Sequence, residues 1–529
     1  MKQPNILFIQ TDQQKAKSLD LYSDINSIST TNLKMLAENG VVFENSYCPY
    51  PLCVPSRISM LTGEYPSSSG YLGNAPTMYD SYGDETIFSA AKKHGYHTML
   101  VGKDHAYGSN CPPDSLSGED ENYPDFLGDI FDRMHFAWHG NTMTPETNKE
   151  LPHIEPWIQY QDELEKLWGS EVAPWDSNES VSSLLSDKAV EFMKDWQNGS
   201  EDKPFAMWLS YPDPHERYQA PTDVVEMINK EDIELPLNWE SDINNRSEYI
   251  QFMHWYFNKG GVPESKVKKL IRVYLGMCLN VEIQLGKVFD CLKEMGEWEN
   301  TIIFYVSDHG DFNGEHQLIQ KFNCGYDGCT HIPMIVAWPG HSKDGRHCLE
   351  PVNLTDIPAT ICELLGWEKF SQDQGQSFAD ILLEETYEER KYTVVESGIP
   401  SESLTTKDVK NFPKHRYDRK TEGRWCYDPP HRFGGRMYVV RSKDYKLIVR
   451  QDKKSEFYNM KDDPWETKNI FGKPKYQKEI INHFEYLVHH LGRVSYKQED
   501  TFIAPQDNIY EAGGDKTWQE YLQQNKNEG

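Results

Sequence analysis

A cysteine stands close to a proline, a serine and an arginine in the stretch 51–63, which reads PLCVPSRISMLTG. The pattern places Cys53 at the start of a predicted helix, where free backbone N–H groups and the helix dipole favour negative charge. Arg57 follows about one turn later and can reach the same place. These residue types fit a nucleophile that acts on an anion, although the pentapeptide alone would favour a buried structural cysteine.

Four short apolar runs end in polar residues that could complete such a site. The runs 5–10, 97–101, 205–209 and 301–306 each read as a buried strand, and helical patterns separate them. This alternation predicts an α/β fold with a doubly wound, mostly parallel sheet flanked by helices, in which ligands bind beyond the carboxyl ends of the strands. We therefore expect one site to collect the residues that follow these runs: Asp12, Lys103, His105, His215, Asp308 and His309.

Several separated motifs together resemble the type I sulfatases, which belong to the alkaline phosphatase superfamily. The residues that carry the resemblance lie between about 5 and 470, and they are C-x-P-S-R at 53–57 with LTG at 61–63, G-K-x-H at 102–105, P-H at 214–215, SDHG at 307–310, GEH at 314–316, Lys321, THIP at 330–333 and D-D-P-x-E at 462–466. The pattern is similar to the iduronate and choline sulfatase types and to the phosphonate monoester hydrolases.

The resemblance implies a modified nucleophile and a divalent metal ion. In that family a formylglycine-generating enzyme oxidises the cysteine, here Cys53, to formylglycine. The implied metal ligands are Asp12, Asp308, His309 and the oxygen of modified Cys53, with Gln13 as a fifth candidate. Many sulfatases carry aspartate where Gln13 stands and asparagine where His309 stands. The oxygen-rich set favours Ca²⁺, and the imidazole makes Mn²⁺ the alternative, with zinc less favoured.

The remaining site residues take their roles from the same resemblance. Arg57 would orient the nucleophile, while Lys103 and Lys321 would hold the sulfate oxygens. His105 would hydrogen-bond the formylglycine. Either His215 or Lys321 would protonate the leaving alcohol.

The implied function is hydrolysis of a sulfate monoester of a sugar or another small alcohol. The nearest alternative is a phosphonate monoester or phosphodiester hydrolase, since that group also shows the Asp-Gln pair, the C-x-P-S-R motif and the Asp-His pair. A third interpretation is an inactive binding protein on the same fold, which the intact Cys53, Arg57, lysines and histidines disfavour. We expect the loops 108–180 and 400–435, which are rich in Trp, Tyr, His and Arg, to form the pocket for a sulfated carbohydrate.

The composition sets limits on domains and partners. The 529 residues are enough for a main domain, predicted at 1–388, and a smaller α+β subdomain at 389–529 with antiparallel strands and a polar tail. The 83 acidic residues against 54 basic ones give a formal charge of −29, which argues against nucleic acid or a membrane surface as partner. The ten cysteines show no CxxC spacing, so reduced thiols are expected.

The first residues predict where the protein works. Residues 1–4 lead directly into an apolar run of only about five residues, too short for a secretion signal or a membrane span. This start predicts a cytoplasmic protein. A chain from which a signal peptide had been removed would begin in the same way, and would be periplasmic or secreted.

Overall fold

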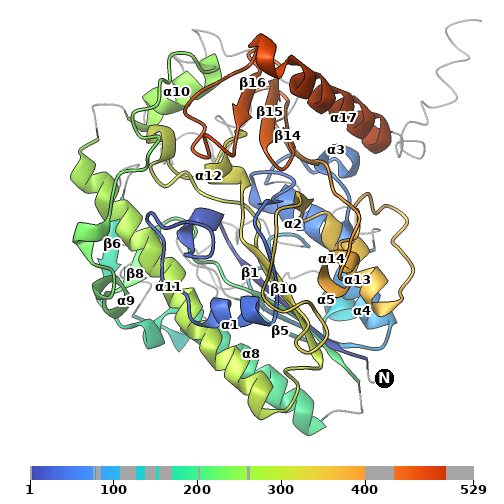
Figure 1. The fold of residues 1–529 in the computed structure, drawn as a ribbon. Helices are drawn as coiled ribbons and strands as arrows, with labels where there is room; N and C mark the ends of the chain where they lie inside the picture. Colours follow the sequence, from blue (N-terminus) through green and yellow to red (C-terminus); the bar gives the residue numbers. More distant parts are fainter. Residues whose placement is uncertain are drawn as a thin grey trace, which may run out of the picture.

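The computed structural model describes residues 3–74, 78, 85–107, 127–136, 150–153, 169–199, 203–258, 262–398 and 434–495. Within these ranges a large sheet carries helices on both faces, and a second, smaller sheet lies across one end of it (Figure 1). The predicted mostly parallel α/β sheet with a smaller antiparallel C-terminal sheet is confirmed.

The large sheet has eight strands in the order β11-β2-β10-β9-β1-β7-β4-β5. Its members are β1 (Asn5–Thr11), β2 (Gly40–Phe43), β4 (His97–Gly102), β5 (Arg133–His135), β7 (Phe205–Ser210), β9 (Thr301–Ser307), β10 (Met334–Ala337) and β11 (Arg346–Cys348). All neighbouring strands pair in parallel except β10, which is antiparallel to both β9 and β2. Strands β9, β1, β7 and β4 therefore end at the same edge of the sheet.

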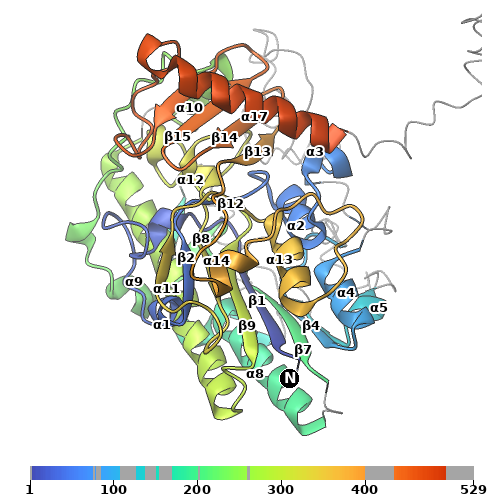
Figure 2. The same ribbon diagram turned by 45° about the vertical axis from the view of Figure 1, so that its right-hand side comes forward.

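Alternate residues of each central strand face opposite sides of the sheet, and both sides are apolar. Leu7 and Ile9 of β1 lie in one hydrophobic cluster, whereas Ile6 and Phe8 lie in another. The first face is covered by α1 (Asn32–Glu38), α8 (Val181–Gly199) and α11 (Glu264–Glu294), and the second by α2 (Cys53–Thr62), α4 (Ile87–Lys93), α13 (Asp356–Leu365) and α14 (Ala379–Leu383) (Figure 2). Burial on both faces explains why the strands read as continuous apolar runs.

The smaller sheet is an antiparallel meander closed by a helix. Its strands are β13 (Thr393–Ser397), β14 (Met437–Arg441), β15 (Tyr445–Arg450) and β16 (Glu456–Asn459), in that order, and α17 (Gln477–Ser495) packs on one face. Residues of the other face, such as Val439 and Ile448, belong to the same apolar cluster as the large sheet. The two sheets thus share a core, and the boundary at 388/389 stays a prediction.

The stretch 222–262, which precedes α11, contains helical elements in its described part. It holds α9 (Thr222–Glu226), the 3₁₀ turn η4 (Lys230–Asp232) and α10 (Glu248–Phe257). Helix α10 buries Tyr249, Phe252 and Phe257 against the core, so its aromatic residues and not its polar ones decide the packing.

The stretch 108–180, predicted as loops with short helices, also contains strands. Its described parts include α5 (Leu127–Ile130), β5, β6 (Ser170–Ala173) and η3 (Ser177–Glu179), and β6 pairs with β8 (Tyr218–Pro221). Most of the predicted pocket loops, including 399–433, lie outside the described residues.

Short elements complete the described part of the chain. They are η1 (Ala16–Ser18), β3 (Ser46–Tyr47), α3 (Pro66–Ser69), η5 (Glu315–Gln317), α12 (Asp327–Thr330), β12 (Val352–Asn353) and η6 (Pro474–Tyr476). Within the described ranges no helix combines the length and the apolar character needed to cross a membrane.

Candidate active site

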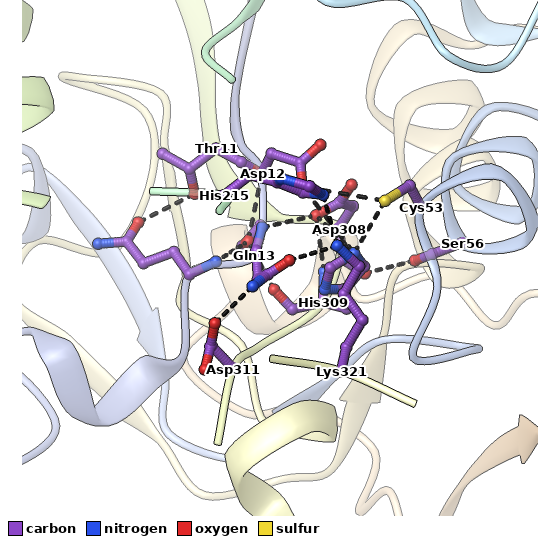
Figure 3. A network of polar contacts seen from close by, with 12 residues as sticks. Thr11, Asp12, Gln13, Cys53, Ser56, His215, Asp308, His309, Asp311 and Lys321 are labelled. Atoms are coloured by element: carbon purple, nitrogen blue, oxygen red, sulfur yellow. Dashed lines mark hydrogen bonds and ion pairs between the residues drawn. The ribbon is translucent and has the colours of Figure 1, made fainter. Parts of the chain in front are cut away.

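The segments that follow β1, β7 and β9 meet the start of α2 at one edge of the large sheet (Figure 3). The segment after β4 joins them through the Lys103 carbonyl, which accepts from Arg57 of α2 at 3.1 Å. Because these four strands are neighbours and parallel, the polar residues after them are brought together, as the strand pattern predicted. The backbone completes the junction, since the Asp12 N–H donates to the Asp213 carbonyl at 3.3 Å and the Asp308 N–H to the Thr11 carbonyl at 3.3 Å.

Cys53 is the first residue of α2, as predicted. The helix ends where Gly63 adopts a left-handed φ of 75°, a conformation that favours glycine. The Cys53 side chain is buried, and its Sγ lies 3.2 Å from His309 Nε2 and 3.9 Å from Asp12 Oδ1. The Ser56 hydroxyl donates to the Asp308 carbonyl at 2.5 Å and so ties the helix to the end of β9.

Arg57, one turn along α2, is buried between two carboxylates. Its Nη2 donates to Asp12 Oδ2 at 2.9 Å, and its Nε donates to Asp308 Oδ2 at 2.8 Å. Its Nη1 donates to Ser210 Oγ at 3.0 Å and to the carbonyls of residues 103 and 104. Every nitrogen of the guanidinium therefore has an acceptor, and the planar fork fixes the separation of the two carboxylates.

Lys103 and His105 enter the site from the end of β4. Gly102 has a φ of 104°, and a Cβ there would lie 2.0 Å from the Ser210 carbonyl oxygen, so only glycine lets the chain turn here. The Lys103 ammonium forms an ion pair with Asp12 Oδ2. Burial lowers the pKa of His105 well below its usual value, and the nearby charges of Lys103 and Arg57 add to that effect.

Lys321 joins His215 to Gln13. Its Nζ lies 2.5 Å from His215 Nε2 and 3.3 Å from Glu216 Oε2, and it also donates to Gln13 Oε1. His215 Nδ1 lies 2.5 Å from the Glu216 carbonyl oxygen. Since an ammonium only donates, His215 Nε2 must accept and the imidazole proton must sit on Nδ1, where it donates to that carbonyl. Burial, with the charge of Lys321, lowers the pKa of His215 well below its usual value, consistent with a neutral ring.

Four potential metal ligands converge in this junction. The ligand atoms of Asp12, Cys53, Asp308 and His309 all lie within 4.8 Å of one another, and all four residues are buried. His309 Nδ1 lies 3.0 Å from the Gly310 carbonyl oxygen, to which it donates, so the ring presents Nε2 to the other three residues. Two carboxylates, an imidazole nitrogen and residue 53 fit a divalent cation that accepts oxygen and nitrogen ligands.

Neighbouring charges shift the pKa values of Asp12 and His309. Burial opposes the ionisation of Asp12, but the positive charges of Lys103 and Arg57 outweigh it and hold its pKa well below the usual value. Burial also opposes the charge on His309, yet Asp308 and Cys53 raise its pKa to about 9. A cation that binds Nε2 must therefore displace a proton.

The structure thus brings together all ten residues singled out in the sequence: Asp12, Gln13, Cys53, Arg57, Lys103, His105, His215, Asp308, His309 and Lys321. Their individual roles stay predictions. The sequence interpretation missed three buried residues, Asp311, Glu216 and Tyr218. Asp311 accepts from Gln13 and Tyr218, and Glu216 accepts from Lys321. The available signal was their position, because each lies within three residues of a predicted site histidine.

Comparisons with known proteins agree with the sequence motifs and the fold. An arylsulfatase of Clostridium perfringens is 26% identical over 494 residues, covering 90% of this chain and 92% of that protein. Among solved structures, the phosphonate monoester hydrolase of Agrobacterium radiobacter superposes with a TM-score of 0.70 at 20% identity, covering 93% of this chain and 96% of that one. A second structure, solved with its substrate D-glucosamine-2-N,6-O-disulfate, superposes with a TM-score of 0.67 at 22% identity. This match covers 94% of this chain and 99% of that one. The sulfatase family model matches residues 4–367, which confirms the resemblance read from the motifs, and the chain belongs to the sulfatase family.

Proposed function

We propose that this sulfatase-family enzyme hydrolyses a sulfate monoester of a sugar or another small alcohol at the junction described above, with residue 53 as the nucleophile. The observation that carries the proposal is the position of Cys53, which starts a helix beside Asp12 and His309 and lies one turn from the buried Arg57. The sulfated sugar bound in the structural neighbour supports a carbohydrate as the alcohol.

Two groups complete this site in the proposal. Oxidation of Cys53 by a formylglycine-generating enzyme would supply an aldehyde, whose hydrate offers an oxygen nucleophile where the structure has Sγ. A divalent cation, with Ca²⁺ favoured and Mn²⁺ the alternative, would supply Lewis-acid charge. Asp12, Asp308 and His309 would hold it, with Gln13 as a further ligand and residue 53 completing the set.

The cations of the site bind and orient the anion. Arg57 holds both metal-binding carboxylates in place, and Lys103 stands beside Asp12. Lys321 lies beside Gln13 and His215, from where its flexible side chain can turn to a sulfate oxygen. These charges neutralise the developing negative charge on the transferred group in a buried site, where such interactions are stronger than in water.

Lys321 and His215 together carry the proton for the leaving alcohol. Because the His215 imidazole is neutral at Nε2 and faces the Lys321 ammonium, the proton is held on Lys321 in this state. It can pass to an alkoxide directly or through His215 Nε2. His105 lies on the Lys103 side of the site, where a neutral imidazole can accept a proton from the nucleophile.

One observation favours a second function. A phosphonate monoester hydrolase is a structural neighbour over nearly the whole chain. The sequence resemblance to that group includes the pairing of Gln13 with Asp12 and of His309 with Asp308. We therefore carry phosphonate monoester or phosphodiester hydrolysis as the second candidate.

Turnover measurements distinguish the two. We expect the purified enzyme to hydrolyse nitrophenyl sulfate with a kcat/KM well above that for a phenyl phosphonate ester, and to release sulfate from a panel of sulfated mono- and disaccharides. Peptide mass analysis should show formylglycine at position 53 in the active fraction. Cys53→Ala is the matched control, since its methyl side chain has no sulfur or oxygen atom from which the aldehyde could form. A preference for the phosphonate ester would reverse the assignment.

A further inference from the structure

We propose that Asp311 is a positioning residue that sets which end of the Gln13 amide faces the metal centre. The inference rests on the metal site of the proposed function. Asp311 is fully buried, and its Oδ2 accepts from Gln13 Nε2 and from the Tyr218 hydroxyl at 2.6 Å. Its Oδ1 accepts from the backbone N–H groups of Asn313 at 2.7 Å and Gln320 at 3.0 Å. The carboxylate is therefore surrounded by four donors.

The partners on the two sides of Gln13 differ in kind. Asp311, an acceptor, binds the amide nitrogen, while Lys321, whose ammonium can only donate, binds the amide oxygen (Figure 3). Turning the amide over would set its N–H groups against the ammonium and its oxygen against the carboxylate. Both hydrogen bonds would be lost in a buried place, so a single orientation is satisfied.

Two hydrogen bonds fix the backbone of Gln13, so the orientation of its side-chain amide is what can still vary. The Gln13 N–H donates to Asp308 Oδ1 at 3.0 Å, and the Gln13 carbonyl accepts from the Tyr274 hydroxyl at 2.9 Å. The backbone of Gln13 has a φ of 70°. The residue is thus held directly beside a predicted metal ligand. An amide oxygen can bind a hard cation but an amide nitrogen cannot, so the orientation decides whether Gln13 is a ligand.

The need for Asp311 follows from glutamine at position 13. A carboxylate there would present oxygen to the cation in either orientation. Compared with a carboxylate, glutamine places one negative charge fewer in the site. It also requires a neighbouring residue that turns its amide oxygen toward the cation. Tyr218, from β8, in turn donates to Asp311 and keeps it in place.

The test is the affinity of chelator-treated, full-length protein for Ca²⁺ and for Mn²⁺, measured by calorimetry without substrate. In Asp311→Asn the new side-chain amide nitrogen would face the amide nitrogen of Gln13 and favour the turned orientation. We expect affinity to fall by about 10- to 100-fold, as for other residues that orient metal ligands. Asp223→Asn, which removes a carboxylate bound to Ser177 and away from the site, is the matched charge control and should change affinity little.

The same substitution in a Gln13→Glu background separates orientation from charge. There the new amide nitrogen at position 311 can donate to the new carboxylate at position 13, so Asp311→Asn should strengthen binding instead of weakening it. A mere loss of negative charge, or a loss of packing, would weaken binding in both backgrounds, and that result would overturn the proposal. If Asp311→Asn alone does not fold, as judged by its thermal unfolding, the comparison of Gln13→Glu with the double variant carries the test.

The result for the wild-type protein distinguishes a failure of the proposed metal site from a failure of the proposed role of Asp311. Chelator-treated wild-type protein that binds neither ion would overturn the metal site of the proposed function and the role of Asp311 together. Wild-type protein that binds an ion, combined with an unchanged affinity in Asp311→Asn, would overturn the role of Asp311 and leave the metal site intact.

Discussion

Replacing Arg57 by methionine should destabilise the metal-free protein strongly, because it leaves two carboxylates buried without their shared partner. Arg57 Nε and Nη2 lie 2.8 and 2.9 Å from Asp308 and Asp12, and none of the three side chains is exposed. Breaking a buried ion pair by removing one partner costs about 3–5 kcal/mol. We expect a loss in that range in the presence of a chelator, although Lys103 still neutralises part of the charge on Asp12.

A bound divalent cation should reduce this loss. The cation supplies positive charge to the same two carboxylates, and the guanidinium that repels it is gone. We expect the destabilisation in saturating Ca²⁺ to be smaller by at least about 1.4 kcal/mol, which by linkage means that the variant binds the ion at least tenfold more tightly. The variant should nevertheless lose its activity, because the anion-binding charge and the fixed carboxylate separation are lost.

Urea unfolding followed by tryptophan fluorescence, with chelator and with Ca²⁺, measures both quantities, and calorimetry checks the affinity independently. Arg57→Lys is the matched variant, since it keeps the charge but cannot bridge the two carboxylates and Ser210. It should recover little of the stability. A metal-free loss below about 1 kcal/mol, or weaker metal binding by Arg57→Met, would refute this electrostatic account.

Three further predictions test other parts of the fold. Burial opposes ionisation of Glu315, but Lys17 and Lys15 lower its pKa to about 2 from 4.5. Glu315→Gln should therefore reduce the free energy of unfolding by about 3 kcal/mol near pH 7. This loss should vanish as the pH falls from about 4.5 through 2, as measured by urea unfolding across pH. Lys446→Met should cost about 3–5 kcal/mol because Asp327 and Glu466 lose the buried ammonium that pairs with both, whereas adding Asp327→Asn and Glu466→Gln should recover most of the loss. Gly102→Ala should reduce the free energy of unfolding by more than about 1 kcal/mol and should reduce kcat, because the new Cβ would lie 2.0 Å from the Ser210 carbonyl oxygen. The control Gly95→Ala, at a similar φ with open space around it, should keep kcat.

The strands and the main site residues could be predicted because their signals are local. An apolar run such as 301–306 followed by Asp308 and His309 marks a buried strand and its carboxyl end within one stretch of sequence. Parallel pairing of such strands then brings their ends together without any further information. The start of α2 at Cys53 follows in the same way from Pro55 in the first turn.

Asp311 and Glu216 could not be assigned in this way, because their function depends on contacts between distant segments. Asp311 binds the side chains of Gln13 and Tyr218, which lie 298 and 93 residues away in sequence. A carboxylate two residues after His309 is equally compatible with a solvated loop until those partners are known. The aromatic packing of α10 is difficult to predict for a related reason, since polar neighbours surround the buried face of a short helix.

The smaller sheet takes part in building the site, although the sequence suggested a separate subdomain. Glu466, the last residue of the D-D-P-x-E motif, accepts from the Asp327 N–H at 2.7 Å, and Lys446 of β15 binds both acids. Asp327 begins α12, whose Cys329 carbonyl accepts from the Gly310 N–H at 2.8 Å.

Helix α12 also holds two other segments of the site. The Thr330 carbonyl accepts from the Cys48 N–H at 3.0 Å, ahead of α2, and the next carbonyl, of His331, accepts from the Ala16 N–H at 3.1 Å, after β1. The segments that carry Cys53, Asp12 and His309 are therefore all fastened to one short helix, and that helix is anchored by charges from the smaller sheet. A chain cut at the predicted boundary would lose Lys446 and Glu466, so the metal site and the C-terminal sheet should form and fail together.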